Sequence, residues 1–366
     1  MGRDGYSFAV LLQFLEDSIK DFPDVRIGKN TVYEVRDAVL SAFSVFFMQC
    51  PSFLAHQKAM GMRKGKNNAQ SIFGVHKIPT DNQIRSLLDP VSPELLFPVF
   101  DRIFEFLVSE GIIRDMVTED GFLLIALDGT WFYSSEQIAC DACQSKQHRN
   151  GQVTYYHSAI TPVIVKPEVN RVVSLPPEFI TVDDGSTKQD CENKAVKRWI
   201  KTIVDRYRYR NDVPLKDGDK AMQVNWMELS ILDKEGTIKK RFSFVTDLPI
   251  TDANITRMIS YGRSRWKIEN ENNNILKTKG YHLEHNFGHG KKHLSNFLMT
   301  LNLLAYLFHT VAEMFDRRYL LLRKTLPSRK TFFQDAQALT KYFFYESWDN
   351  LLKAMVIGLE LEDPGG

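Results

Sequence analysis

Twenty consecutive residues, His293–Ala312, contain no Asp, Glu, Lys or Arg. This stretch, HLSNFLMTLNLLAYLFHTVA, is long enough to cross a membrane as a helix. Polar residues are spread through it, namely Ser295, Asn296, Thr300, Asn302, His309 and Thr310. A helix that is apolar on all sides and carries scattered polar groups is typical of a protein core. We therefore predict a buried core helix and no membrane partner.

The composition agrees with a chain that works in the cytoplasm. Of its 366 residues, 43% are hydrophobic and 25% are charged, which is enough for a sizeable core in two or three domains. Four cysteines in a chain of this length do not form a disulfide framework, and the N-terminus lacks the pattern of a signal peptide. The net charge of +2 favours no particular partner, so a prediction of DNA binding must depend on local basic clusters.

The order of helical and strand patterns divides the chain into three regions. Residues 1–120 read as an all-helical N-terminal domain, because apolar residues recur at spacings of three and four. Residues 121–310 combine helices with short runs rich in β-branched and aromatic residues, which predict a mixed α/β core, α+β overall. Residues 311–366 are helical again.

Local signals place several helix ends in the N-terminal domain. Thr80 or Asp81 can cap a helix that stops before Pro90. A further helix begins with Pro93 in its first turn, and Pro98 must kink or restart it. We expect short, separate helices here.

Asp128 is the first candidate site residue. It ends the apolar run GFLLIALDG (Gly121–Gly129), which looks like a buried central strand. Ligands bind at such strand ends in open α/β sheets. The alternative is an ordinary Asp-Gly turn residue.

Glu269 is the second candidate, on one long helix expected over residues 251–280. Residues four apart on this helix share a face, which presents Tyr261, Arg265, Glu269, Asn273 and Lys277. A solvated face with the pairs Arg265–Glu269 and Lys267–Glu271 is the alternative. Trp266 and five asparagines are unusual on such a face, so both interpretations stay open.

Cysteine and histidine residues raise the question of a metal site. Cys140 and Cys143 form a C-x2-C pair with His148 and His157 downstream, which is half of a zinc site, and Cys191 is too distant to be assigned. We prefer two reduced loop cysteines over zinc at this pair. A second group is His282, His285, His289 and His293, close to Lys291 and Lys292. For it we rank phosphate contact first, structural histidines second and a metal last.

The Glu269 helix resembles the Tyr-Arg-Glu-Lys signature of cut-and-paste DDE transposases from bacterial insertion sequences. The matching block is RWKIENENNNILKTKGYHLEHNFGHGKKHL (Arg265–Leu294), and KQDCENKAVKRW (Lys188–Trp199) looks like a second family block. The strand ending in Leu-Asp-Gly-Thr (Leu127–Thr130) is similar to the first catalytic strand of that family. The likeness covers most of the chain.

This resemblance implies an RNase H-like mixed sheet flanked by helices, with a β-rich insertion and the last core strand at about residues 206–245. In such enzymes three carboxylates hold two Mg²⁺ or Mn²⁺ ions for in-line attack on a phosphodiester. Carried over, Asp128 is the first ligand and Glu269 the last. The partner is double-stranded DNA, bound by a homodimer at paired element ends in the nucleoid of a bacterium or archaeon.

The resemblance also implies DNA contacts. Tyr261, Arg265 and Lys277 would contact phosphates, and Trp266 would stack on a displaced base or pack in the core. The N-terminal domain would recognise element ends through a basic loop, with an ordinary solvated loop as the alternative. That loop carries Arg63, Lys64 and Lys66.

The spacing departs from the family pattern, which has two residues between Tyr and Arg and six between Glu and Lys. Here there are three (262–264) and seven (270–276), so Lys279 competes with Lys277. The strand that should carry a second aspartate is not visible, because such a strand and its crossover need about 30 residues. Asp205 is the only positional substitute. We expect a transposase, degenerate if that strand and aspartate are lost; the alternatives are a non-catalytic DNA-binding remnant and, more weakly, a structural zinc protein.

Overall fold

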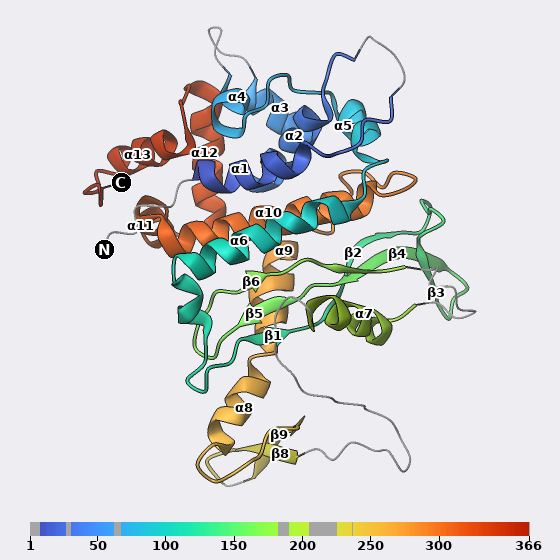
Figure 1. Cartoon of the computed structure of the whole chain (residues 1–366), viewed down its shortest axis with the longest axis vertical. Coiled ribbons are helices and arrows are strands. Elements are labelled where there is room, and N and C mark those ends of the chain that lie inside the picture. The colour runs from blue at the N-terminus through green and yellow to red at the C-terminus, as the bar shows by residue number, and fades with distance from the viewer. Residues whose placement is uncertain are drawn as a thin grey trace.

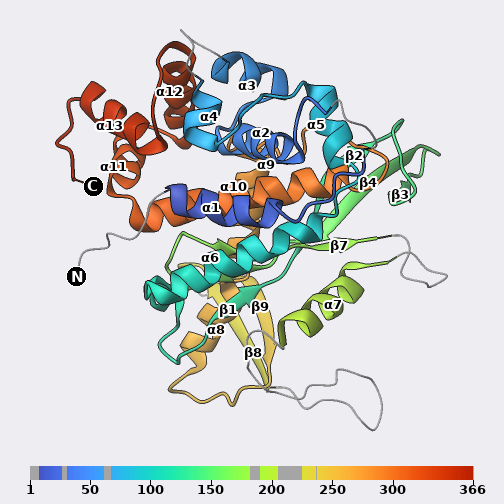
Figure 2. The ribbon, with the colours of Figure 1, turned by 45° about the horizontal axis from the view of Figure 1, so that its top comes forward.

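The computed structural model of this protein describes residues 8–26, 31–61, 67–181, 190–204, 225–235 and 237–365. It is mixed α and β, as predicted. The N-terminal and C-terminal helices gather on one side of several small sheets, and helix α10 (Leu294–Phe315) runs between the two layers (Figures 1 and 2).

The elements follow one another along the chain in three groups. The N-terminal helices are α1 (Phe8–Ile19), α2 (Val35–Phe47), α3 (Phe53–Met60), α4 (Asn68–Phe73), α5 (Asp81–Leu88), η1 (Pro93–Leu96), α6 (Phe97–Ser109) and η2 (Ile112–Met116). The strands are β1 (Leu124–Ala126), β2 (Gly129–Ser135), β3 (Gln144–Gln147), β4 (Val153–Ile160), β5 (Val163–Val165), β6 (Val173–Ser174), β7 (Glu178–Ile180), β8 (Asn225–Leu232) and β9 (Ile238–Thr246). The later helices are α7 (Glu192–Val204), α8 (Ile255–Arg263), the π-helix η3 (Ile268–Asn273), α9 (Asn274–Thr278), α10, α11 (Arg317–Thr325), α12 (Arg329–Tyr342) and α13 (Trp348–Gly358).

Two predicted helix boundaries in the N-terminal domain are confirmed. Thr80 is the N-cap of α5, and its backbone N–H donates to Gln83 Oε1 at 3.2 Å, as in a capping box. Helix α5 ends at Leu88, before Pro90. The Pro98 signal is also confirmed, because the short helix η1 gives way to α6 there and proline occupies the first turn of α6.

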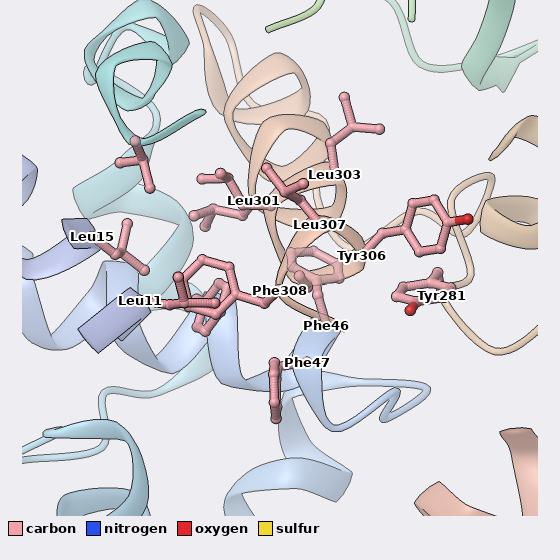
Figure 3. Packing of buried hydrophobic residues seen from close by; sticks show 14 of the residues in the cluster. Leu11, Leu15, Phe46, Phe47, Tyr281, Leu301, Leu303, Tyr306, Leu307 and Phe308 are labelled. Atoms are coloured by element: carbon pink, nitrogen blue, oxygen red, sulfur yellow. The ribbon is translucent and has the colours of Figure 1, made fainter. Parts of the chain in front are cut away.

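Helix α10 is the buried core helix that the charge-free stretch predicts. It is the one helix in the described part of the chain that is long and apolar enough to cross a membrane, and 94% of its most apolar window is buried inside the protein. It contacts α1, α2, α5, α9, α11 and β6. Figure 3 shows its side chains meeting those of α1 and α2; the Phe308 ring lies 4.8 Å from that of Phe43 and 6.2 Å from that of Phe8. The helix is covered by protein on almost every side.

One hydrophobic cluster extends from Phe8 in α1 to Val356 in α13. It includes side chains from the helices and from β1, β5 and β6, and therefore from all three predicted regions. The boundaries at residues 120 and 310 stay predictions, and the regions share one core.

The strands form three small sheets, and every described strand pair is antiparallel. The orders are β1-β5-β6, then β2-β4-β3 with β7 also on β4, and the hairpin β8-β9. The prediction of a buried central strand at Gly121–Gly129 is wrong. Strand β1 has three residues, lies at a sheet edge and buries only Ala126, because the chain leaves this sheet at Asp128 to enter the next one. Residues 205–224, where a further core strand was in question, lie outside the described residues.

Substituting Phe308 by alanine tests the central role of α10. We expect the free energy of unfolding to fall by about 3–5 kcal/mol, because a fully buried ring leaves a cavity among other rings. Urea unfolding followed by circular dichroism measures the change. Ile357→Ala, at a side chain that is 64% exposed, is the control and should change stability by less than about 0.5 kcal/mol. Equal losses for the two variants would contradict this assignment.

Candidate functional site

Asp128 lies where the chain passes from the sheet of β1 to the sheet of β2. Ala126 pairs with Val163 in one sheet and Gly129 with Ile160 in the other, so Asp128 stands in the gap between the two ladders. Its carbonyl oxygen accepts a hydrogen bond of 3.0 Å from the backbone N–H of Thr161, in the matching gap of the partner strand. The backbone of Asp128 is therefore fixed on both sides.

Two asparagines of the π-helix η3 reach this junction. Asn273 Nδ2 lies 3.5 Å from Asp128 Oδ2, at the limit of a hydrogen bond, and Asn273 Oδ1 accepts from Thr161 Oγ1 and Asn272 Nδ2, each at 3.0 Å. Both asparagines are buried. This explains part of the unusual asparagine content of the segment. Asn273 was expected on the shared face, whereas Thr161 was not expected at the site, because it lies inside a strand-like run of the sequence.

The predicted continuous helix over residues 251–280 is wrong in detail. Helix α8 ends at Arg263, the chain turns, and η3 then adopts i→i+5 geometry before α9. Ser264 is buried and its hydroxyl donates to the carbonyl of Ser260 at 2.9 Å, a bond that bends helices. The Tyr306 hydroxyl donates to the Glu271 carbonyl inside η3. A π-turn at this place absorbs one extra residue, and such turns are frequent at functional sites.

Charged groups of both signs surround Asp128. Burial raises the pKa of its carboxyl, the negative charge of Glu269 raises it further, and the charges of Arg265 and Lys277 oppose this rise. Glu269 is paired with Arg265 at 2.9 Å, with both side chains about half exposed, and Lys277 is paired with Glu284 at 2.8 Å. The charges of Glu269, Arg265 and Lys277 thus act on Asp128, which lies far from them in sequence.

The other predicted residues of this helix have different surroundings. Tyr261 donates its hydroxyl to Asp120 Oδ2 at 2.7 Å, which ties α8 to the segment before β1. Trp266 packs edge-on against Phe242 at 4.9 Å and borders an open pocket of about 1190 Å³ between α8, β9 and β1. Lys279 is exposed just after α9.

A carboxylate that the sequence analysis missed is Glu192, at the start of α7. A Cβ at Gly129 would overlap its carboxylate, so Glu192 lies against the residue that follows Asp128. Among the described residues, however, no three carboxylates have oxygen atoms within 4.8 Å of one another. Asp205 and the basic loop with Arg63, Lys64 and Lys66 lie outside the described residues.

A second group of side chains does converge. Cys140, Cys143, His157 and His289 each offer one atom to a cluster whose atoms all lie within 4.8 Å of one another. The Sγ atoms are 3.8 Å apart, His157 Nε2 is 3.5 and 3.4 Å from them, and His289 Nε2 is 3.3 Å from Cys143 Sγ and 3.1 Å from His157 Nε2. The prediction of half a zinc site is therefore corrected. His157 and His289 supply the other half, and this donor set could hold a metal such as zinc.

The surroundings of the cluster favour the neutral forms of His157, His289 and Cys143. Burial, and then the neighbouring His289, lowers the pKa of His157 to about 4, and burial also lowers the pKa of His289. Burial raises the pKa of Cys143 to about 11. Neutral imidazoles are ready to act as ligands near pH 7, whereas the thiols must lose protons when a metal binds.

The loop that carries His289 is fastened separately by Asp89, which follows α5. The carboxylate of Asp89 accepts from the backbone N–H groups of Lys291, Lys292 and Leu294 at 3.0–3.3 Å. Burial alone would raise its pKa, but these donors outweigh burial and hold the pKa below its usual range. The backbone donors of Lys291 and Lys292 are thus already used, and their exposed side chains remain for the predicted phosphate contact. His289 also belongs to the cluster that could hold a metal, the possibility ranked last for it.

Comparisons with known protein families, with curated proteins and with solved structures find no match to this chain.

The raised pKa of Asp128 gives a pH-dependent stability effect. Its ionised form is less favourable in the folded chain than in the unfolded one, so this destabilisation is present above the folded pKa and vanishes below the unfolded pKa. We therefore expect Asp128→Asn to raise the free energy of unfolding at pH 7, by less than about 1 kcal/mol, and to leave it unchanged near pH 3. Thermal unfolding at several pH values measures this, with the exposed Asp141→Asn as control. A gain that persists at low pH would contradict the electrostatic cause.

Proposed function

We propose that this chain acts on DNA as a transposase of the cut-and-paste DDE type, with an RNase H-like catalytic domain. One observation carries the proposal: Asp128, beside the end of β1, feels the negative charge of Glu269 from a distant helical segment, together with the charges of Arg265 and Lys277. These are the residues that the Tyr-Arg-Glu-Lys signature would place around a reacting phosphodiester. A pair of carboxylates among cations is suited to a phosphate group with a bound divalent metal.

The π-helix supports the assignment of Lys277. The chain has one residue more between Glu269 and Lys277 than the signature has. In a regular α-helix, residues eight apart lie about 80° apart around the axis, so Lys277 would stand at the margin of the face of Glu269, whereas the separation of seven in the signature gives only about 20°. Because η3 takes up one residue in a wider turn, Lys277 returns to that face, and its charge acts on Asp128.

The donor set fits one divalent cation better than two. Asp128 and Glu269 offer hard carboxylate oxygens, whose mutual repulsion a Mg²⁺ or Mn²⁺ ion would relieve, with water completing its coordination. The bound ion would supply Lewis-acid activation of a phosphate oxygen. A second ion needs a third carboxylate, which the described residues do not bring within reach. Glu192, which lies against Gly129, is a candidate for this third carboxylate.

The basic side chains have roles in this proposal that follow from their exposure. Arg265 is half exposed and is paired with Glu269. When a divalent cation binds Glu269 instead, the Arg265 guanidinium is free to bind a DNA phosphate. Lys279, Lys291 and Lys292 are exposed and would add phosphate contacts that weaken with salt. Arg63, Lys64 and Lys66, which lie outside the described residues, would contact the element ends because of the resemblance alone. A homodimer would bind the paired ends.

A second function fits the absence of a third carboxylate within reach among the described residues: a DNA-binding protein that occupies element ends without cutting them. It would use the same basic side chains and the same folded core. It differs from the first function only in the absence of metal-dependent cleavage.

Cleavage of a DNA duplex tests the proposal. The substrate is the terminal inverted repeat that flanks the gene, with Mg²⁺ or Mn²⁺ present. We expect Asp128→Ala and Glu269→Ala each to slow cleavage at least about a hundred-fold while binding of the duplex persists, because they remove charge stabilisation and not the fold. The control is Asp335→Ala, at an exposed carboxylate on α12.

The outcomes separate the two functions. Binding without cleavage by the wild type identifies the second function, and neither binding nor cleavage overturns both. If the wild type cuts, Glu192→Gln and Asp205→Asn show which residue supplies the third carboxylate.

A further inference from the structure

We propose that Cys140, Cys143, His157 and His289 bind one zinc ion in a closed, four-coordinate structural site. This site shares no residue with the Asp128–Glu269 pair and does not depend on the proposed DNA chemistry. Its four donors come from the turn before β3, from β4 and from the loop before α10.

The distances within the cluster are those of a tetrahedron around zinc. With zinc–sulfur bonds of about 2.3 Å and zinc–nitrogen bonds of about 2.0–2.1 Å, tetrahedral angles give edges of about 3.8 Å for S···S, 3.5–3.6 Å for S···N and 3.3 Å for N···N. Five of the six edges match: 3.8 Å for the two sulfurs, 3.3–3.5 Å for three sulfur–nitrogen pairs, and 3.1 Å for the two nitrogens, while the sixth, between Cys140 Sγ and His289 Nε2, lies within 4.8 Å. Two thiolates and two imidazoles in this shape favour zinc.

The hydrogen bonds around the cluster orient the donors toward one point. The Nδ1 atom of His289 lies 3.0 Å from the carbonyl oxygen of Gly290, which can only accept, so Nδ1 carries the proton and Nε2 offers its lone pair. The backbone N–H of Cys143 donates to the Cys140 carbonyl at 3.0 Å, which closes a tight turn. The N–H of Cys140 points at Cys143 Sγ, 3.4 Å away, where it can stabilise a thiolate.

Hydrogen bonds among the four groups alone do not account for this geometry. His289 Nε2 has one lone pair and no proton, yet it lies within hydrogen-bonding distance of both Cys143 Sγ and His157 Nε2. His157 Nε2 in turn faces both thiols. A cation at the centre satisfies all four donors at once. Rings of Phe132 and Tyr133 pack around the two imidazoles and limit access of water.

The role of such an ion would be to join the sheet to the helical layer. His157 and His289 are 132 residues apart in the chain, and the loop of His289 has its other anchor in Asp89. Zinc would hold this loop from the side of β4 while Asp89 holds it from the side of α5.

Metal analysis and cobalt substitution test the site. Protein purified from zinc-containing medium should hold about one zinc per chain, and the Co²⁺-loaded protein should show the intense visible bands of tetrahedral cobalt with a thiolate charge-transfer band. Cys143→Ser and His289→Ala should lose both signals. Cys191→Ser and His148→Ala, at exposed residues outside the cluster, should keep them.

Chelation provides a second readout that needs no variant. Removing the metal from the wild type should lower its thermal midpoint, and equimolar zinc should restore it. A folded wild type that holds no zinc and gives no tetrahedral cobalt spectrum overturns the proposal. Full zinc content in both ligand variants would overturn the choice of ligands.

Discussion

The burial of α10 is the constraint on which the rest of the structure depends. A helix without charged residues over most of its length is unfavourable in water on every face, so protein must cover it all round. Helices α1 and α2 cover one side, and β6 and α9 reach it from another. The N-terminal helices and the sheets are consequently held against the same surface, and the candidate sites lie in segments that this common support positions.

A polar network of α10, α12 and Tyr281 holds the chain between the two candidate sites. Arg329 in α12, whose side chain is 13% exposed, donates to the Tyr281 hydroxyl and to Glu313, each at 2.8 Å. The Tyr281 hydroxyl is also 2.6 Å from His309 Nδ1 in α10. Breaking one partner of such a network leaves a buried charge or dipole without compensation. The network therefore fixes the chain at Tyr281, between the segment of Lys277 and the loop of His289.

Several helices could be predicted from the sequence, but only part of each candidate site could. Thr80, Pro98 and the charge-free stretch act through neighbouring residues, so their consequences for α5, α6 and α10 could be predicted. The cluster of Cys140, Cys143, His157 and His289 could not be predicted, because the two histidines meet the C-x2-C pair only through strand pairing and a loop anchored far away. The asparagine-rich segment signalled a special environment at Glu269, but its π-turn depends on contacts such as that of Tyr306. Glu192 escaped because α7 folds back onto Gly129.

The position of α10 late in the chain has a consequence for synthesis on the ribosome. The apolar faces of α1 and α2, including Phe8 and Phe43, are completed by Phe308, which is made 300 residues after Phe8 and 265 residues after Phe43. Until α10 leaves the ribosome, these faces lack part of their native cover, although Phe8 can already meet Phe47 and Phe73. The nascent chain must keep the uncovered part from aggregating by transient contacts or with a chaperone. A truncated mRNA that ends before the codons of α10 would yield a chain with an incomplete hydrophobic core.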